Sequence, residues 1–147
     1  MIKRVLTMAL TLMLGLCIFV GCAGDGYDQI SAKEAKTIMD TKTNYVIVDV
    51  RRSDEFASGH IKNAINLPNE TIEFYAEEKL PNKDQLILVY CRTGNRSKKA
   101  CEKLVELGYT NLKEFGGIET DWTYDDYVVK DWQNIFWGGC FKHPFLF

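Results

Sequence analysis

The sequence is poor in the patterns that mark metal sites, nucleic-acid binding and repeat proteins. Its only two histidines are His60 and His143, and no group of histidine, cysteine and acidic residues has the spacing of metal ligands. No basic patch is present and the formal net charge is −2, which argues against nucleic acid as a partner. The sequence therefore predicts a protein without a bound metal ion, and no cofactor is expected.

No apolar run is long enough for a membrane-spanning helix, which needs about 20 residues. The longest run, Val5–Val20, follows two basic residues and ends in small ones, as a signal peptide does. The residues before Cys22 resemble a bacterial lipoprotein signal, which predicts a signal peptide at 1–21 and lipidation of Cys22. Ordinary secretion with cleavage near Gly24, or an uncleaved anchor, are the alternatives. We expect an extracytoplasmic protein that Cys22 anchors to the cell membrane, with a short tether at 22–26.

The strongest functional signal is the segment Leu86–Ser97, with the sequence LILVYCRTGNRS. Its apolar, β-branched start lies between two helical patterns and predicts a buried parallel strand that ends at Cys91. A short loop with two arginines and a glycine follows, and a helix is predicted over Ser97–Leu107. Open α/β sheets bind ligands at such strand ends, and backbone N–H groups at a helix start favour anions. We therefore expect Arg92 and Arg96 to lower the pKa of Cys91 and to favour its thiolate.

Two further motifs accompany this loop, one before it and one after it. The earlier motif is the strand pattern Val46–Arg51, followed by Glu55, Phe56, Gly59, His60, Ile61, Ala64, Asn66 and Pro68. The later motif is Gly116-Gly117-Ile118, followed by Trp122. In this order, and with Cys91–Arg96 between them, the motifs resemble the rhodanese (sulfurtransferase) family. The resemblance covers about residues 27 to 124.

The resemblance implies that Cys91 is a catalytic nucleophile. Its thiolate would take the outer sulfur of thiosulfate or of a persulfide, and a thiol would then accept that sulfur. The surrounding loop would bind the substrate and the cysteine persulfide, with backbone N–H groups facing the anion. The loop residues assigned to this role are Arg92, Thr93, Gly94, Asn95 and Arg96. The predicted partners are therefore a small anionic sulfur donor, a thiol acceptor and, through Cys22, the membrane.

Loop length distinguishes the chemistries that the resemblance allows. Four residues separate Cys91 from Arg96, and family members with this short loop have a pocket sized for a single sulfur atom. Phosphatases and arsenate reductases of the same fold have one more residue between cysteine and arginine, and are the least favoured alternative here. A second alternative, from another functional class, is a non-catalytic rhodanese-fold binding or regulatory module whose cysteine is idle.

Four residues outside the loop are interpreted as structural support. Asp49, Arg51 and Glu55 recur in the family pattern, and we interpret them as an arginine–carboxylate arrangement that fixes the active-site loop. His60 is a candidate base, but a thiolate that is already formed needs none, and the family's histidine at this position is structural.

The remaining cysteines give no disulfide framework. Cys101 shares an apolar helical face with Ala100, Leu104 and Val105, so core packing is its predicted role. The functional alternative is a resolving thiol for Cys91. Cys140 cannot be placed, and no structural disulfide is predicted.

Alternating strand and helix patterns predict an α/β fold, a single rhodanese-like domain at 27–126 with a mostly parallel central sheet of about five strands and helices on both faces. Strands are expected at Tyr27–Ile30, Tyr45–Asp49, Ala64–Leu67, up to Cys91, and at Asn111–Phe115. Helices are expected from the Ser31–Glu34 capping box to about Asp40, from Ser53 or Asp54 to Gly59, after an Asn69 cap, at Ser97–Leu107 and at Gly117–Trp122. The inward residues expected in the helix after Asn69 are Ile72, Phe74 or Tyr75, and Leu80.

Residues 127–147 form an aromatic C-terminal tail with no clean period, and their structure is not predicted. An extra packing segment, a contact with the membrane surface and a gene-model artefact are competing explanations of this tail. An artefact or an unstructured extension is favoured.

Overall fold

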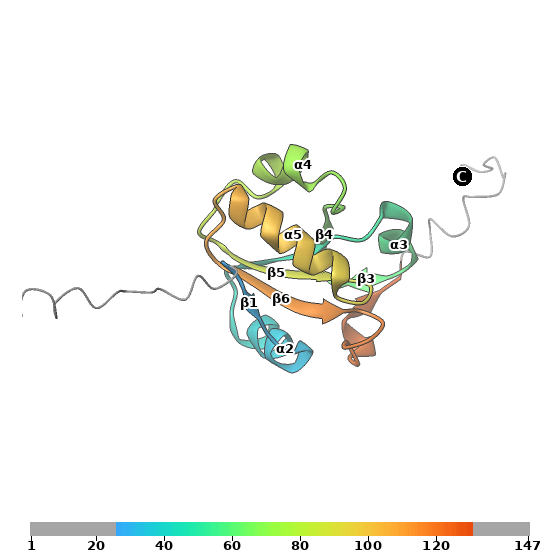
Figure 1. The fold of residues 1–147 in the computed structure, drawn as a ribbon. Helices are drawn as coiled ribbons and strands as arrows, with labels where there is room; N and C mark the ends of the chain where they lie inside the picture. Colours follow the sequence, from blue (N-terminus) through green and yellow to red (C-terminus); the bar gives the residue numbers. More distant parts are fainter. Residues whose placement is uncertain (1–25, 131–147) are drawn as a thin grey trace, which may run out of the picture.

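Five parallel strands form the central sheet of the computed structural model, which describes residues 26–130 (Figure 1). The strand order is β1-β6-β5-β2-β4, and every neighbouring pair is parallel. The strands are β1 (Asp28–Gln29), β2 (Tyr45–Asp49), β4 (Ala64–Asn66), β5 (Leu86–Cys91) and β6 (Leu112–Gly117). The predicted α/β fold with a sheet of about five parallel strands is confirmed. Strands β3 (His60–Ile61) and β7 (Val128–Val129) form a separate antiparallel pair.

Helices cover both faces of this sheet, as predicted. Helix α2 (Ala32–Thr41) packs on one face, while α4 (Ile72–Lys79) and α5 (Asn95–Glu106) pack on the other. The short helix α3 (Ser53–Ser58) lies near the carboxyl ends of the strands. Within residues 26–130, no helix combines the length and the apolar character that crossing a bilayer requires.

Strand β5 lies in the middle of the sheet and is buried over its whole length. Its alternate side chains enter different cores, because successive side chains of a strand point to opposite faces. Ile87, Val89 and Cys91 belong to the core beneath α4 and α5, whereas Leu86, Leu88 and Tyr90 belong to the core beneath α2. Burial of each large aliphatic side chain contributes about 1.5–3 kcal/mol, so the strand that carries Cys91 is a rigid support.

Local hydrogen bonds decide where the helices begin, and two of the starts differ from the predicted ones. The Ser31–Glu34 capping box opens α2 as predicted. Helix α5 begins at Asn95, two residues before the predicted Ser97, because Gly94 takes the left-handed conformation (φ 92°) and ends the loop there. Ser53 or Asp54 was the predicted cap of helix α3, and this prediction is wrong. The cap is Arg52, whose backbone N–H donates to the Glu55 carboxylate.

The expected inward aromatics of α4 are on the wrong side of the helix. Phe74 is 79% exposed and Tyr75 is 48% exposed. Ile72 and Leu80 are buried as predicted, and together with Ala76 they fill the inward positions at four-residue spacing. Asn69 does not cap this helix, whose first turn follows Thr71, and the Asn69 side-chain oxygen is buried without a partner in the described part of the chain.

The predicted helix at Gly117–Trp122 is also wrong. Strand β6 continues to Gly117, and a single turn follows in which the N–H groups of Asp121 and Trp122 both donate to the Gly117 carbonyl. The chain then reaches β7, which pairs with β3 and lies inside the segment 127–147 that was predicted to be a tail. The rest of that segment, from residue 131, lies outside the described residues, as do Cys140, the signal segment and Cys22.

Candidate active site

Cys91 is the last residue of the central strand β5, between β2 and β6. Its side chain is 1% exposed. The Gly94 backbone N–H donates to Cys91 Sγ over 3.1 Å. A hydrogen bond to sulfur favours its charged form, so the loop presents a donor to a thiolate or persulfide at this position.

The loop is fastened to the turn that follows β6. The N–H of Ile118 donates to the Cys91 carbonyl at 2.9 Å, and the N–H of Glu119 donates to the Arg92 carbonyl at 3.2 Å. Gly117 lies directly against the backbone of Arg92 and Thr93, with no room for a β-carbon. The Gly-Gly motif therefore allows two backbone segments to approach closely behind the cysteine.

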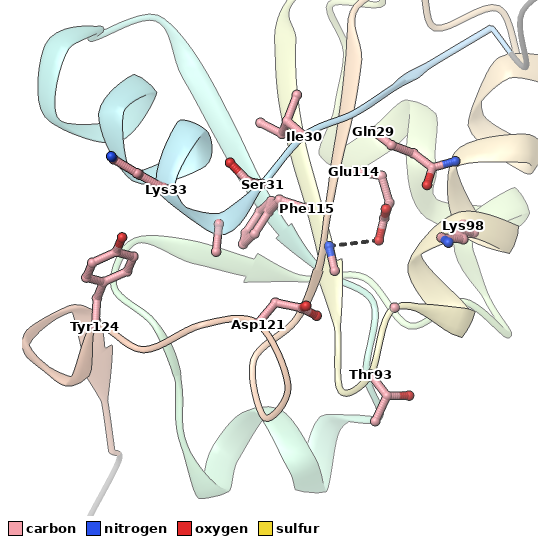
Figure 2. Close-up of a pocket in the computed structure, with 13 residues that line it drawn as sticks. Gln29, Ile30, Ser31, Lys33, Thr93, Lys98, Glu114, Phe115, Asp121 and Tyr124 are labelled. Atoms are coloured by element: carbon pink, nitrogen blue, oxygen red, sulfur yellow. Dashed lines mark hydrogen bonds between the residues drawn. The ribbon is translucent and has the colours of Figure 1, made fainter.

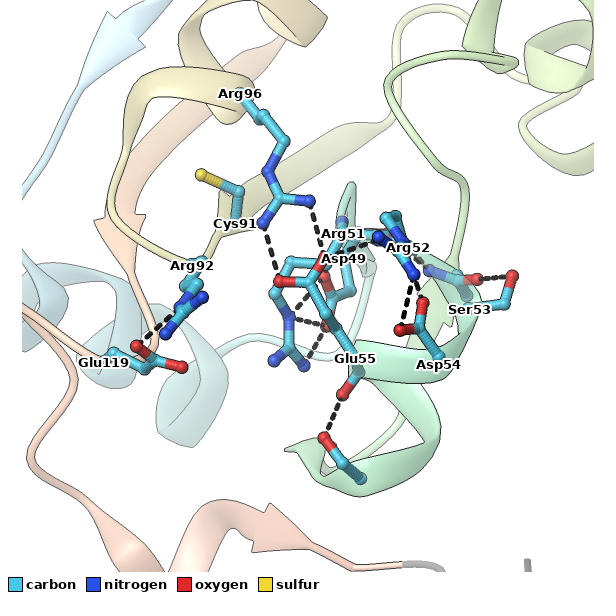
Figure 3. A network of polar contacts seen from close by, with 12 residues as sticks. Asp49, Arg51, Arg52, Ser53, Asp54, Glu55, Cys91, Arg92, Arg96 and Glu119 are labelled. Atoms are coloured by element: carbon cyan, nitrogen blue, oxygen red, sulfur yellow. Dashed lines mark hydrogen bonds and ion pairs between the residues drawn. The ribbon is translucent and has the colours of Figure 1, made fainter. Parts of the chain in front are cut away.

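Arg96 is held by Glu55 of helix α3 through two hydrogen bonds of 2.6 and 2.8 Å (Figure 3). These bonds lower the pKa of Glu55 to about 2 and raise the pKa of Arg96. The pair joins the first turn of α5 to α3 across the loop. A bidentate arginine–carboxylate pair fixes geometry as well as charge, so Arg96 is positioned beside Cys91 and is already neutralised.

Arg92 is exposed to solvent, where it pairs with an acidic side chain. Its Nε donates to Glu119 over 2.7 Å, and both side chains are more than half exposed. The hydrogen bond to Glu119 raises the pKa of Arg92. Such exposed pairs contribute little to stability, so an incoming anion can displace the Glu119 carboxylate from Arg92.

Asp49 and Arg51 form a buried ion pair at the end of β2. The Arg51 guanidinium donates to both Asp49 oxygens at 2.7–3.0 Å, and also to the Gly59 carbonyl. The Asn66 amide donates to the carbonyls of Asp49 and Arg51. These bonds tie β2 to β4 and to the end of α3, which is the helix that supplies Glu55.

His60 contacts α3 and not the cysteine. Its Nδ1 lies 3.0 Å from the Phe56 carbonyl, and its ring stacks on Phe56 with centroids 3.8 Å apart. Thr93 and Asn95 are exposed. Of the predicted loop residues, Gly94 and Arg96 therefore make the contacts that define the site, through a backbone N–H and a guanidinium.

Three further residues belong to the site and were not predicted from the sequence. Glu119 partners Arg92, and Ser97 and Glu114 form a buried polar group behind the loop. A cavity of about 500 Å³ adjoins this group, lined in part by Thr93, Lys98 and Asp121 (Figure 2). The signal for Glu114 was available, since it is a charged residue at an inward position of a predicted strand. No pattern marked Glu119.

Cys101 is a buried residue of α5 itself, and burial raises the pKa of its thiol. Cys91 and Cys101 are both free thiols. The burial of Cys101 supports packing as its role. Within residues 26–130, no three His, Cys, Asp or Glu side chains are grouped as metal ligands.

Replacement of Glu55 by Gln is expected to destabilise the protein at neutral pH by about 1–2 kcal/mol, because a partly buried charged pair is lost. The folded-state pKa of Glu55 is lowered from 4.5 to about 2. Its contribution is therefore fully present above about pH 4.5 and disappears as the pH falls towards 2. Urea unfolding of both proteins across this range measures the difference.

Asp54→Asn is the matched control, because Asp54 lies on the same helix in an exposed pair with Arg52. It should change the unfolding free energy little at any pH. A wild-type advantage over Glu55→Gln that stayed constant down to about pH 2 would contradict the assignment.

Comparison with known proteins shows the family to which the chain belongs. Residues 31–122 match the family model of the rhodanese-like domain. The thiosulfate sulfurtransferase GlpE of Coxiella burnetii is 37% identical over 95 residues, which cover 64% of this chain and 86% of that protein. The adenylyltransferase and sulfurtransferase UBA4 of Candida albicans is 33% identical over 103 residues, or 66% of this chain, but this chain spans only 24% of its length.

A solved structure of an Escherichia coli rhodanese with anions is 30% identical, with a TM-score of 0.52, and covers 58% of this chain and 98% of its own. The predicted resemblance is thus confirmed by sequence and by fold. The chain belongs to the rhodanese-like domain family.

Proposed function

We propose that the protein is a sulfurtransferase that moves a sulfane sulfur from thiosulfate or a persulfide to a thiol acceptor through a persulfide on Cys91. The observation that carries this proposal is the Gly94 N–H pointed at Cys91 Sγ at a strand end, between two arginines. A thiolate that accepts a backbone hydrogen bond, with two ion-paired arginines in the same loop, is a competent nucleophile. The thiosulfate sulfurtransferase named among the relatives supports the choice of donor.

In the first half-reaction the Cys91 thiolate attacks the outer sulfur of thiosulfate. A new S–S bond forms, the original S–S bond breaks, and its electron pair leaves with sulfite. With a persulfide donor, the leaving group is the donor's thiolate. The product is a Cys91 persulfide anion, which would sit where Gly94 and the adjacent loop N–H groups donate.

In the second half-reaction a nucleophilic acceptor attacks the outer sulfur of the persulfide. The Cys91–sulfur bond breaks, and its electron pair restores the Cys91 thiolate. A thiolate acceptor leaves as a persulfide, and cyanide leaves as thiocyanate. Neither step needs a general base, which agrees with the contacts of His60 to α3.

The two arginines have different parts in this scheme. Arg96 is neutralised by Glu55 and mainly holds the loop. Arg92 is exposed, and its weak pair with Glu119 can exchange for the sulfonate end of thiosulfate. The E. coli rhodanese solved with anions shows that a relative binds anions.

The proposal is tested by supplying purified protein with thiosulfate and cyanide, and separately with a low-molecular-weight persulfide and a thiol. We expect thiocyanate in the first case and a persulfide of the added thiol in the second, both with ping-pong kinetics. A folded protein that transfers sulfur from neither donor would instead support the binding-module alternative. Release of phosphate from an aryl phosphate would support the phosphatase alternative.

We further propose that the protein acts outside the cytoplasmic membrane, anchored by a lipid on Cys22. The sequence pattern that ends at Cys22 is the basis of this proposal. Replacement of Cys22 by Ser is expected to move the protein from the membrane fraction to the soluble fraction of cells. An unchanged membrane fraction in this variant, with the signal segment still attached, would favour the uncleaved anchor.

A further inference from the structure

A buried carboxylate lies directly behind the active-site loop. Glu114 belongs to β6 and lies opposite Val89 of β5. It is only 3% exposed, because this face of the sheet packs against α5. Burial of a charged group is unfavourable unless hydrogen bonds compensate. The burial of Glu114 therefore needs an explanation, and the proposed sulfur-transfer steps do not use this carboxylate directly.

Glu114 reaches the loop through one side chain. Its Oε1 lies 2.6 Å from the hydroxyl oxygen of Ser97, which is fully buried in the first turns of α5. The single hydroxyl hydrogen of Ser97 is shared between this carboxylate oxygen and the Gly94 carbonyl oxygen, which lies 2.8 Å from the hydroxyl oxygen. Gly94 is the residue whose N–H donates to Cys91 Sγ. Glu114 is thus connected to the reacting sulfur through Ser97 and Gly94.

The same carboxylate oxygen also fixes the opposite side of the loop. It accepts the N–H of Gly116 at 2.9 Å (Figure 2). Gly116 has φ 89° and lies at the irregularity that brings Gly117 into register with Cys91. Gly117 then packs against Arg92 and Thr93. One buried oxygen of Glu114 therefore helps to fix the position of Gly94, through Ser97, and the position of the Gly116–Gly117 backbone that packs behind the loop.

Gly94 needs this support because of its conformation. Its φ of 92° lies in the left-handed region, and glycine loses more conformational freedom on folding than any other residue. An alternative conformation of Gly94 would turn its N–H away from Cys91. The buried Ser97 hydroxyl bonds to the Gly94 carbonyl and is itself held by the buried Glu114 carboxylate. These contacts disfavour the alternative conformation of Gly94.

We propose that Glu114 is a positioning residue for the sulfur-transfer step, which acts through Ser97 to keep the Gly94 N–H directed at Cys91. This inference rests on the proposed sulfurtransferase function. Glu114 does not contact the substrate, and its effect is on the reactivity of the cysteine. The charged groups of the loop that carries Cys91 are Arg92 and Arg96, which pair with Glu119 and Glu55, and Glu70 also acts on Arg96.

Three variants test this role. Glu114→Gln keeps an acceptor oxygen of the same size, whereas Glu114→Leu removes the acceptor and Ser97→Ala removes the connecting hydroxyl. The control is Leu112→Ala, a cavity on the same strand and in the same core. The thiolate of Cys91 is titrated by its ultraviolet absorbance, as the difference between each protein and the same protein carrying Cys91→Ser.

We expect Glu114→Leu and Ser97→Ala to raise the midpoint of the Cys91 titration by about one pH unit, as loss of one hydrogen bond to a charged group implies. Their kcat should fall by about tenfold to a hundredfold, with a smaller change in KM. Glu114→Gln should keep the wild-type midpoint and most of the activity. Leu112→Ala should lower Tm without moving the midpoint.

A wild-type midpoint and kcat in folded Glu114→Leu and Ser97→Ala would overturn the proposal. So would a Glu114→Gln protein that behaves like Glu114→Leu, because the amide oxygen can accept the same bonds. If Glu114→Leu does not fold, Ser97→Ala carries the test. The titration needs no turnover, so it is decisive even if the wild-type protein transfers no sulfur, an outcome that would reject the proposed function alone.

Discussion

Replacement of Cys91 by Ser is expected to abolish sulfur transfer, with a loss of at least about a thousandfold in kcat. A serine hydroxyl is not ionised at neutral pH and cannot form a stable persulfide. The side chain is 1% exposed and of similar size, so the fold should persist. The thiocyanate assay measures activity, and circular dichroism with thermal unfolding checks the fold.

Cys101→Ala is the matched control, because Cys101 is the other described cysteine and is fully buried in the same core. It should lower stability by about 1 kcal/mol, as small cavities do, while the rate of sulfur transfer stays at the wild-type level. Full activity in Cys91→Ser would disprove the mechanism. A large loss in Cys101→Ala would instead indicate the resolving-thiol role.

Replacement of Gly117 by Ala should reduce the proposed sulfur transfer more than it reduces the stability of the protein. A β-carbon at this position would collide with the Arg92 carbonyl and lie 2.5 Å from the Thr93 Cα. Backbone atoms cannot rotate away, so the active-site loop must shift. Displacement of a reacting group by about 1 Å costs about a hundredfold in rate, and the overpacking itself costs about 1–3 kcal/mol. Steady-state kinetics and urea unfolding give the two quantities.

Gly108→Ala separates loop displacement from general instability. Gly108 follows α5 at the end remote from Cys91 and has φ 87°, and an added β-carbon would make only an ordinary contact of 3.9 Å with the Lys83 side chain. The left-handed strain of alanine there should cost about 1–2 kcal/mol and leave kcat unchanged. If Gly117→Ala and Gly108→Ala lost equal activity at equal stability, displacement of the active-site loop would not explain the effect of Gly117→Ala.

The sequence predicted the parts of the site that depend on local pattern. The strand before Cys91 is a continuous apolar run, the glycine in the loop allows the left-handed turn, and the Ser31–Glu34 box marks a helix start. Each of these depends on residues close together in the chain. The fold class followed from the alternation of such strand and helix patterns, and the family from the resemblance of three ordered motifs at Val46–Pro68, Cys91–Arg96 and Gly116–Trp122.

The errors concern contacts between distant segments. Residue Glu114 meets Ser97 only because β6 lies beside β5, and Arg92 meets Glu119 only because the chain turns after Gly117. The inward face of α4 was misjudged because aromatic residues were favoured over the small Ala76. Residues 118–121 form a single turn where a helix was predicted. The Gly117 carbonyl accepts the N–H groups of both Asp121 and Trp122, and this closes the turn.

The central claim, that Cys91 carries the transferred sulfur, is tested most directly by the mass of the protein after treatment with thiosulfate and removal of excess reagent. We expect an increase by the mass of one sulfur atom, located on the peptide that contains Cys91 and lost when cyanide is added. An unmodified Cys91 peptide in folded protein, or an adduct on another cysteine, would contradict it.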